Sequence, residues 1–222
     1  MKYTAIYLLT ALVALSLFSS CKKDTEIENA NQVGSSKIIY FPSVAINGDH
    51  LVIVNPGGTY TEAGAVAILN GDTTKYTITG GPVSGPGVYN LVYTASNPQN
   101  YTASDWRTVV ILGNDISSND FSGTYTRYVN GVAGATSTWT KTAPGIYTVE
   151  NPGGAGAGVG LTVTAVNYSA YNIAIPQQIS ADFGLTSSAN ASTTGGAGGA
   201  ITGYSWIFNA GGYGTSLRTF SK

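Results

Sequence analysis

The sequence predicts an all-β protein built from short antiparallel strands, and three observations support this. Short runs in which apolar and polar residues alternate recur throughout residues 37–222, as expected for half-buried strands. Turn pairs such as Asn130-Gly131 and Pro144-Gly145 separate these runs. No window longer than ten residues keeps the apolar spacing of a helix without Gly, Pro or runs of Thr and Val. Regular short strands with such turns indicate a sandwich or a barrel.

The composition excludes several classes of protein. The chain has 222 residues, a formal net charge of −1 and only 9% charged residues, so it lacks the basic surface that binds nucleic acid. Hydrophobic residues make up 43% of the chain, which is enough to bury a core and argues against a disordered polymer.

The first residues resemble an export signal. Lys2 precedes an apolar run over residues 4–18, and Ser19 and Ser20 follow. The alternative is a membrane-spanning helix, which needs about 20 apolar residues where this run has about 15. We therefore predict a signal peptide over residues 1–20.

Cys21 is the only cysteine, so it has no partner for an internal disulfide. The segment 18–21 (Phe-Ser-Ser-Cys) resembles a bacterial lipobox, with Phe18 where Leu is usual, which implies that Cys21 is lipidated and anchors the protein to the outer membrane. Residues 21–36 are predicted to form a flexible tether. Residues 22–26 resemble the export signal of Bacteroidota surface lipoproteins, which implies an anchor facing the cell exterior.

The polar stretch 113–120 divides the folded part into predicted domains at 37–115 and 116–222. The predicted strands fall into one set before this boundary and one set after it. They cover residues 37–41, 51–54, 65–69, 75–79, 87–95 and 106–112, and then 123–128, 136–141, 145–150, 160–166, 171–175, 201–208 and 215–220.

Residues 58–112 carry a recognisable motif. The segments 60–67 and 86–97, then Asn100 and Ala103, and then Arg107-Thr108-Val109 resemble a signature of bacterial immunoglobulin-like surface domains. That signature runs Y-x-D-x-G-x-x-A, P-G-x-Y-x-V-x-Y-x-A-x-D, G-N-x-A and R-x-V. The resemblance implies an immunoglobulin-like sandwich. Glu62, Asn97 and Gln99 depart from the signature, which bears on whether a polar network of some family members is kept. Independently, the strand 87–95 alternates so that Tyr89, Leu91, Tyr93 and Ala95 share a core-facing side.

The C-terminal part resembles the β domains that follow an immunoglobulin-like domain in Bacteroidota surface lipoproteins found with glycan-uptake systems. The resemblance is carried by residues 120–127, 144–149 and 218–222. We expect these strands to form an antiparallel, lipocalin-like barrel or a second sandwich. In the barrel, Tyr125 on the first strand would stack under Arg218 on the last as a cation–π closure.

The sequence shows no catalytic pattern and implies no cofactor. The only histidine, His50, follows a turn, and no Gly-x-Ser-x-Gly motif accompanies it. Metal-ligand spacings are missing as well, although calcium held between separate loops stays open. Scattered carboxylates could pair as in a glycosidase, but no spacing favours two of them. The Gly-rich runs 153–158 and 195–199 do not match phosphate-binding motifs and are predicted to be loops or bulges.

Aromatic side chains are the remaining candidates, because sugars stack their C–H faces on such rings. We select Trp139, Tyr101, Trp206 and Tyr204, and expect the rings of Trp139 and Tyr101 to be exposed. The opposing interpretation is that these aromatics form the core or cross-strand pairs.

Two functions remain after these exclusions, and both are non-catalytic. The first is glycan capture for a polysaccharide uptake system, with an outer-membrane transporter as a further partner. The second is a structural or adhesion module with a protein partner. Coplanar exposed aromatics would favour glycan, whereas an unpaired edge strand would favour a protein.

Overall fold

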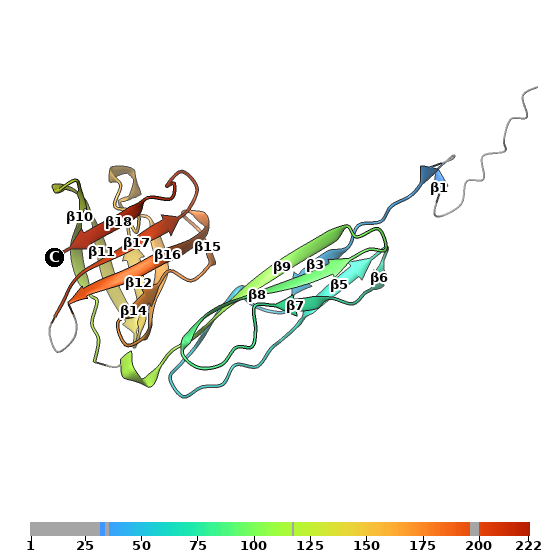
Figure 1. The fold of residues 1–222 in the computed structure, drawn as a ribbon, viewed down its shortest axis with the longest axis horizontal. Coiled ribbons are helices and arrows are strands. Elements are labelled where there is room, and N and C mark those ends of the chain that lie inside the picture. Colours follow the sequence, from blue (N-terminus) through green and yellow to red (C-terminus); the bar gives the residue numbers. More distant parts are fainter. Residues whose placement is uncertain (1–31, 34–35, 117, 196–199) are drawn as a thin grey trace, which may run out of the picture. The chain divides into compact units, whose positions relative to one another are not determined.

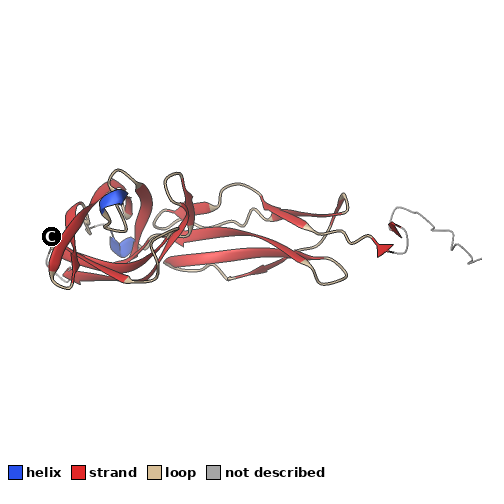
Figure 2. Cartoon of the chain, turned by 90° about the horizontal axis from the view of Figure 1, so that it is seen from above, coloured by secondary structure: helices blue, strands red, loops and turns tan. Residues whose placement is uncertain are grey.

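The computed structural model describes residues 32–33, 36–116, 118–195 and 200–222. The predicted signal peptide, Cys21 and most of the predicted tether lie outside these residues. The chain divides into one unit up to Tyr40 and a second from Phe41 to Lys222. Figure 2 shows that strands dominate the fold. Within the described ranges, none of the helical segments has the length and apolar character to cross a membrane.

In the first unit, β1 (Gln32–Val33) pairs with β2 (Ser36–Lys37). The prediction of a strand over 37–41 is wrong beyond Lys37, because residues 38–42 adopt no regular structure. Pro42 has no N–H to donate to a ladder, so the next strand starts only after it.

Two sheets build the region between residues 43 and 111 (Figure 1). One has three strands in the order β3, β5, β6, and the other has four in the order β4, β9, β8, β7. β4 runs parallel to β9, whereas the other pairs are antiparallel. The strands are β3 (Ser43–Ile46), β4 (Leu51–Val54), β5 (Ala65–Leu69), β6 (Asp72–Thr73), β7 (Thr77–Thr79), β8 (Gly87–Ser96) and β9 (Thr102–Ile111).

The core of this sandwich follows the alternation predicted for residues 87–95. Leu91, Tyr93 and Ala95 are buried on β8, and Tyr89 packs beside them while partly exposed. Val109 on β9 completes the centre of the cluster. The predicted core face of this strand is therefore confirmed.

The polar stretch 113–120 is short and is held by hydrogen bonds. It contains the 3₁₀ turn η1 (Asn114–Ile116). Gly113 N donates to Tyr168 O at 2.7 Å, and Ala170 N donates to the Asp115 carboxylate at the same distance.

Nine strands form a single curled sheet after residue 120, in the order β14-β13-β12-β11-β10-β18-β17-β16-β15. The first strand of this set, β10, therefore pairs with the last, β18, as in a closing barrel (Figure 1). The strands are β10 (Gly123–Val129), β11 (Val132–Ala143), β12 (Ile146–Glu150), β13 (Thr162–Ser169), β14 (Asn172–Ala174), β15 (Gln178–Ser180), β16 (Gly184–Gly195), β17 (Ile201–Asn209) and β18 (Leu217–Ser221).

Side chains, rather than backbone pairs, bridge part of the gap between the two edges of this sheet. The Gln178 amide on β15 accepts from Thr164 N at 3.0 Å and donates to Thr164 O at 2.7 Å. Two residues share the same role at Thr162: the Ser180 hydroxyl donates to Thr162 O, and the Asp182 carboxylate accepts from Thr162 N. These contacts tie β15 to β13 where no ladder joins them.

An aromatic cluster fills the inside of the curled sheet. It includes Phe121, Trp139, Tyr204, Trp206 and Phe220, all at most 1% exposed. The expected cation–π pair between Tyr125 and Arg218 is wrong. Thr126 pairs with Ser221, so Lys222 lies at the level of Tyr125, and its Nζ is 4.9 Å from the ring centroid.

The sequence did not predict β1, which lies in the predicted tether, nor β3, β6, β15 or β16. β16 is a twelve-residue strand made mostly of Gly, Ser, Ala, Asn and Thr, so it lacks the apolar alternation that marks a strand. Of the two Gly-rich runs, residues 156–158 form the 3₁₀ turn η2 (Gly156–Gly158), and Gly195 ends β16 at a register shift.

Candidate functional site

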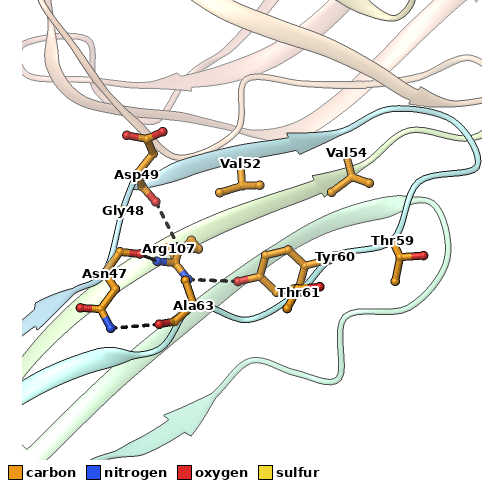
Figure 3. A pocket seen from close by; sticks show the side chains of 10 residues that line it. All are labelled: Asn47, Gly48, Asp49, Val52, Val54, Thr59, Tyr60, Thr61, Ala63 and Arg107. Atoms are coloured by element: carbon orange, nitrogen blue, oxygen red, sulfur yellow. Dashed lines mark hydrogen bonds between the residues drawn. The ribbon is translucent and has the colours of Figure 1, made fainter.

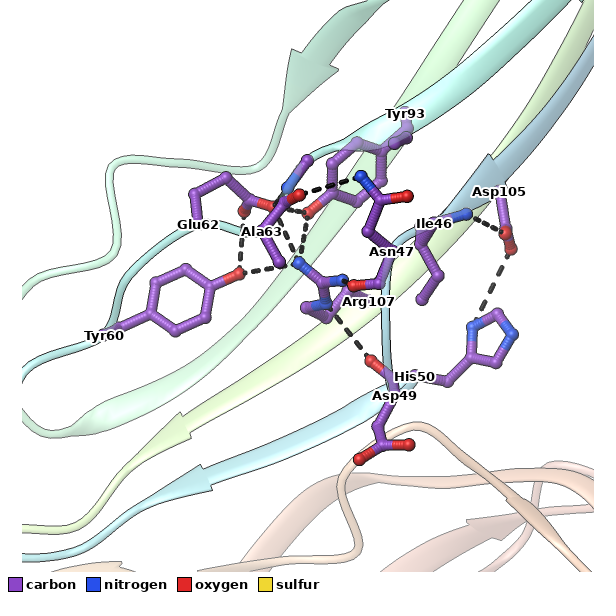
Figure 4. A network of polar contacts seen from close by, with 12 residues as sticks. Ile46, Asn47, Asp49, His50, Tyr60, Glu62, Ala63, Tyr93, Asp105 and Arg107 are labelled. Carbon is purple, nitrogen blue, oxygen red and sulfur yellow. Dashed lines mark hydrogen bonds and ion pairs between the residues drawn. The ribbon is translucent and has the colours of Figure 1, made fainter.

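A polar network joins two buried residues of the sandwich, Arg107 and Tyr93, to Tyr60 and to the exposed Glu62, and residues of the recognised motif form it (Figure 4). Arg107 on β9 is 1% exposed, and its Nη1 lies 2.7 Å from Oε1 of Glu62. The hydroxyls of Tyr93 and Tyr60 each donate to the Glu62 carboxylate at 2.7 Å. Glu62 thus fills the motif position of an Asp without loss of the network.

The ionisation of the network follows from these contacts. Burial alone would raise the pKa of Glu62, but hydrogen bonds from Tyr93, Tyr60 and Gly64 N and the charge of Arg107 bring the pKa below its usual value. Burial and the bond to Glu62 raise the pKa of Tyr93. The carboxylate is therefore ionised and the phenols are neutral at neutral pH.

The rest of the Arg107 guanidinium holds a turn. Nε donates to Asp49 O at 3.1 Å, and Nη2 donates to Asn47 O. The guanidinium N–H groups of Arg107 thus bond both Glu62 and the backbone of the 47–50 turn. Arg107 therefore orders this turn, which joins β3 to β4. We assign the network a structural role.

A groove of about 240 Å³ opens beside this network (Figure 3). Its walls are the edge strand β4, through Val52 and Val54, and the segment 59–63 with Tyr60. β3 stays paired as far as Asn47 N, which donates to Gly64 O, and the chain then turns away to form β4. Its mostly apolar lining suits an aliphatic side chain or one edge of a sugar.

A second surface feature is an exposed aromatic pair. The rings of Phe41 and Tyr101 lie 5.0 Å apart between centroids at an interplanar angle of 57°. Their exposed fractions are 63% and 47%. The exposure predicted for Tyr101 is confirmed. Phe41 was not among the candidates, all of which are Trp or Tyr.

Hydrogen bonds fix the loop that carries Tyr101. The Asn97 side chain accepts from Gln99 N at 3.0 Å and from Tyr101 N at 2.9 Å. Asn97 N donates to Tyr101 O, and Asn100 N donates to Asn97 O. Gln99 and Asn100 themselves are exposed. The loop thus carries two exposed amide side chains in the two positions before Tyr101.

The other three aromatic candidates lie in the core, so the expected exposure of Trp139 is wrong. Trp139 is 1% exposed and stacks on Trp206, with ring centroids 5.4 Å apart; Trp206 is 0% exposed and Tyr204 1% exposed. The sequence signal was present, since Trp139 lies between Thr138 and Thr140. In a strand this alternation turns the ring to one face and the hydroxyls to the other. None of the three can stack on a sugar in this structure.

His50 lies outside both features. Its Nδ1 lies 2.7 Å from Trp106 O and 3.8 Å from the Asp105 carboxylate, and its ring packs on Trp106. The Asp105 carboxylate in turn accepts from Ile46 N, so it caps β3. Across the described part of the chain, no group of three or more His, Cys, Asp or Glu side chains could hold a metal ion.

Comparison with known proteins gives one family match. Residues 44–111 match the family described as "Bacterial surface protein, Ig-like domain". No curated protein matches the chain. Among solved structures, the chain is similar to the crystal structure of the lipoprotein BT2262 from Bacteroides thetaiotaomicron, at 24% identity over 81% of this chain and 98% of that chain. The TM-score is 0.36, which is too low to infer a shared fold or function. The part of the chain from 44 to 111 is therefore similar to the immunoglobulin-like domains of bacterial surface proteins.

Proposed function

We propose that the protein is a non-catalytic, lipid-anchored module of the outer cell surface that binds glycan for a polysaccharide uptake system. The supporting observation is the Phe41–Tyr101 pair beside the exposed amides of Gln99 and Asn100. An outer-membrane transporter would take over the captured glycan. Cys21 would provide the anchor.

The chemistry of this corner suits an uncharged sugar. Aromatic rings bury the C–H faces of a pyranose, and amide groups can donate and accept hydrogen bonds to its hydroxyls. Because Asn97 holds the loop in place before binding, little conformational entropy is lost when a ligand arrives. The two rings are tilted rather than coplanar, so this pair is not the coplanar arrangement that was expected to favour glycan. Tilted rings suit a bent chain or a chain end better than a flat polymer.

Affinity electrophoresis of the full-length chain in detergent, in gels that contain single neutral polysaccharides, tests this function. We expect retardation by at least one polysaccharide, and Tyr101→Ala and Phe41→Ala should each weaken it about tenfold, which corresponds to about 1.4 kcal/mol. The matched control is Ile78→Ala, because Ile78 on β7 is exposed to a similar extent, 43%.

A retardation that survives both aromatic substitutions would contradict this site. If no polysaccharide retards the protein, glycan binding itself is contradicted.

One observation favours the second function, a module with a protein partner. β4 is an edge strand of its sheet, and the apolar groove runs along its free side. An extended peptide could pair with such an edge and place a side chain in the groove. This function becomes the better explanation if polysaccharides do not bind.

A further inference from the structure

Two arginines face the inside of the curled sheet at one end without an acidic partner. Arg127 on β10 pairs in register with Phe220 on β18, and Arg218 faces the same side as Phe220 because it lies two residues away. Arg218 is 6% exposed, and Arg127 is half-buried. In the described ranges, neither guanidinium has a carboxylate within 4.0 Å.

Among the residues that the structure describes, backbone carbonyl groups alone accept hydrogen bonds from the two guanidinium groups. Nη1 of Arg127 donates to Gly154 O at 3.2 Å and, more weakly, to Gly153 O. Arg218 donates to Ser216 O at 3.0 Å and to Tyr213 O. The Nε atoms of both arginines are buried and have no hydrogen-bond partner in the described part of the chain. With five N–H donors on each group, several donors are left unused.

Two loops enclose this arginine pair, which we define as Arg127 and Arg218. The loop 151–158 packs so tightly that a Cβ at Gly153 would lie 1.9 Å from the Tyr213 ring, and one at Gly154 would lie 2.6 Å from Arg127 Cδ. Arg218 lies over the same ring, with Cζ 5.4 Å from its centroid. The aromatic ring and the glycines therefore hold both guanidinium groups in fixed positions.

The electrostatics of the pair are unfavourable as it stands. Burial, and then the like charge of Arg127, lower the pKa of Arg218. Arginine nevertheless stays protonated in proteins, so two positive charges remain in a region of low dielectric. Buried charges are normally paired with an opposite charge. The two arginines contact only uncharged carbonyl groups, so they have no counter-charge.

We propose that the arginine pair binds an oxyanion group, either sulfate or carboxylate. A guanidinium presents its N–H donors in a planar fork that matches the oxygen atoms of such groups, and an anion would offset the repulsion between the two charges. Arg127 is half-buried, so part of its side chain meets solvent although its Nε is buried. The site is separate from the Phe41–Tyr101 pair, so it stands or falls independently of neutral glycan binding.

Isothermal titration of the full-length chain with sodium sulfate and with sodium glucuronate, against a sodium chloride background of constant ionic strength, tests the proposal. Sulfate stabilises most folded proteins through exclusion from their surface, so a thermal shift alone would not suffice. We expect saturable binding that Arg127→Met weakens at least tenfold. Arg127→Lys keeps the charge but not the planar fork of N–H donors, so its affinity should lie between that of the unsubstituted chain and that of Arg127→Met.

Lys222→Met is the matched control, because it removes the same charge from the same sheet. It should bind as the unsubstituted chain does. Circular dichroism of Arg127→Met must first show the native spectrum; if it does not, the comparison is made with Arg127→Lys, which must then bind at least threefold more weakly.

Absence of saturable binding by the unsubstituted chain would overturn the proposal, and so would undiminished binding by Arg127→Met. Glucose, which carries no charge, must not compete with glucuronate at this site. Tighter binding of glucuronate than of sulfate would identify the anion as part of an acidic sugar, and tighter binding of sulfate would identify it as a free ion.

Discussion

Arg107 is buried inside the immunoglobulin-like sandwich, where an unpaired positive charge would be costly. Glu62 supplies the counter-charge, and Tyr60 and Tyr93 donate to its oxygens. The same guanidinium fixes the backbone of Asn47 and Asp49. A single carboxylate therefore supports the arginine that orders the turn between β3 and β4, where the chain passes from one sheet to the other.

Replacing this carboxylate should destabilise the domain in a pH-dependent manner. Glu62→Gln leaves Arg107 buried without an ion pair, and we expect it to lower the free energy of unfolding by about 2–4 kcal/mol at pH 7. Folding lowers the Glu62 pKa, so its contribution is fully present above the unfolded value of 4.5 and is lost as the pH falls through the folded pKa. Urea unfolding of the full-length chain at pH 7 and pH 3 measures both effects.

The matched control is Asp72→Asn, which removes an exposed carboxylate from β6 in the same domain. Its effect should stay within 0.5 kcal/mol, about the usual size for surface substitutions. A Glu62→Gln effect that is equally large at pH 3 and pH 7 would contradict the ionic role assigned to Glu62.

At the scale of elements, the edges of the nine-stranded sheet matter most. β15 and β13 are not joined by a ladder, and the Gln178 amide takes the place of one backbone pair by bonding both N and O of Thr164. Gln178 is 7% exposed, so water does not readily replace these bonds. A side chain thus satisfies an edge that would otherwise be open to pairing with other strands.

Gln178→Met, which keeps the length of the side chain but not the amide, should lower the free energy of unfolding by about 2–3 kcal/mol because two backbone groups lose their partners. Hydrogen exchange of the Thr164 amide should also become faster than in the unsubstituted chain. Ile179→Ala is the control, because Ile179 is 64% exposed and its loss should change neither quantity. An unchanged exchange rate in Gln178→Met would show that Gln178 does not close the sheet.

At the scale of the whole molecule, the last strand is a central one. β18 pairs with β10 on one side and with β17 on the other. It therefore joins the strands β10 to β14 to the strands β15 to β17. Phe220 on this strand stacks on Tyr204 within the aromatic core, with ring centroids 4.6 Å apart. Local unfolding of the C-terminus would therefore split the sheet in its middle.

Deletion of residues 217–222 should abolish the near-ultraviolet circular dichroism that arises from Trp139 and Trp206, because both rings lose the packing that fixes them. Deletion of Lys222 alone keeps every pair from Leu217 to Ser221 and should retain this signal. A shortened chain that kept the near-ultraviolet signal would show that the sheet closes without β18.

Individual strands show how much of the fold can be predicted from local sequence. The strands at 51–54 and 65–69 were predicted with the observed bounds, because each is a short apolar run between clear turns. The prediction failed at β16, whose small polar residues give no periodic signal, and at Trp139, where alternation with threonine was interpreted as exposure.

By itself, the sequence determined the all-β class, the core face of β8 and the resemblance to an immunoglobulin-like surface domain, because strand alternation, turn residues and motif spacing are local properties of the chain. Only the tertiary structure decided which aromatics are exposed, which cation lies over the Tyr125 ring and which side chains join β15 to β13. The grouping of Arg127 with Arg218 and of Phe41 with Tyr101 also belongs to the fold. These contacts join residues far apart in the sequence, and the register of the sheets and the path of the loops set them.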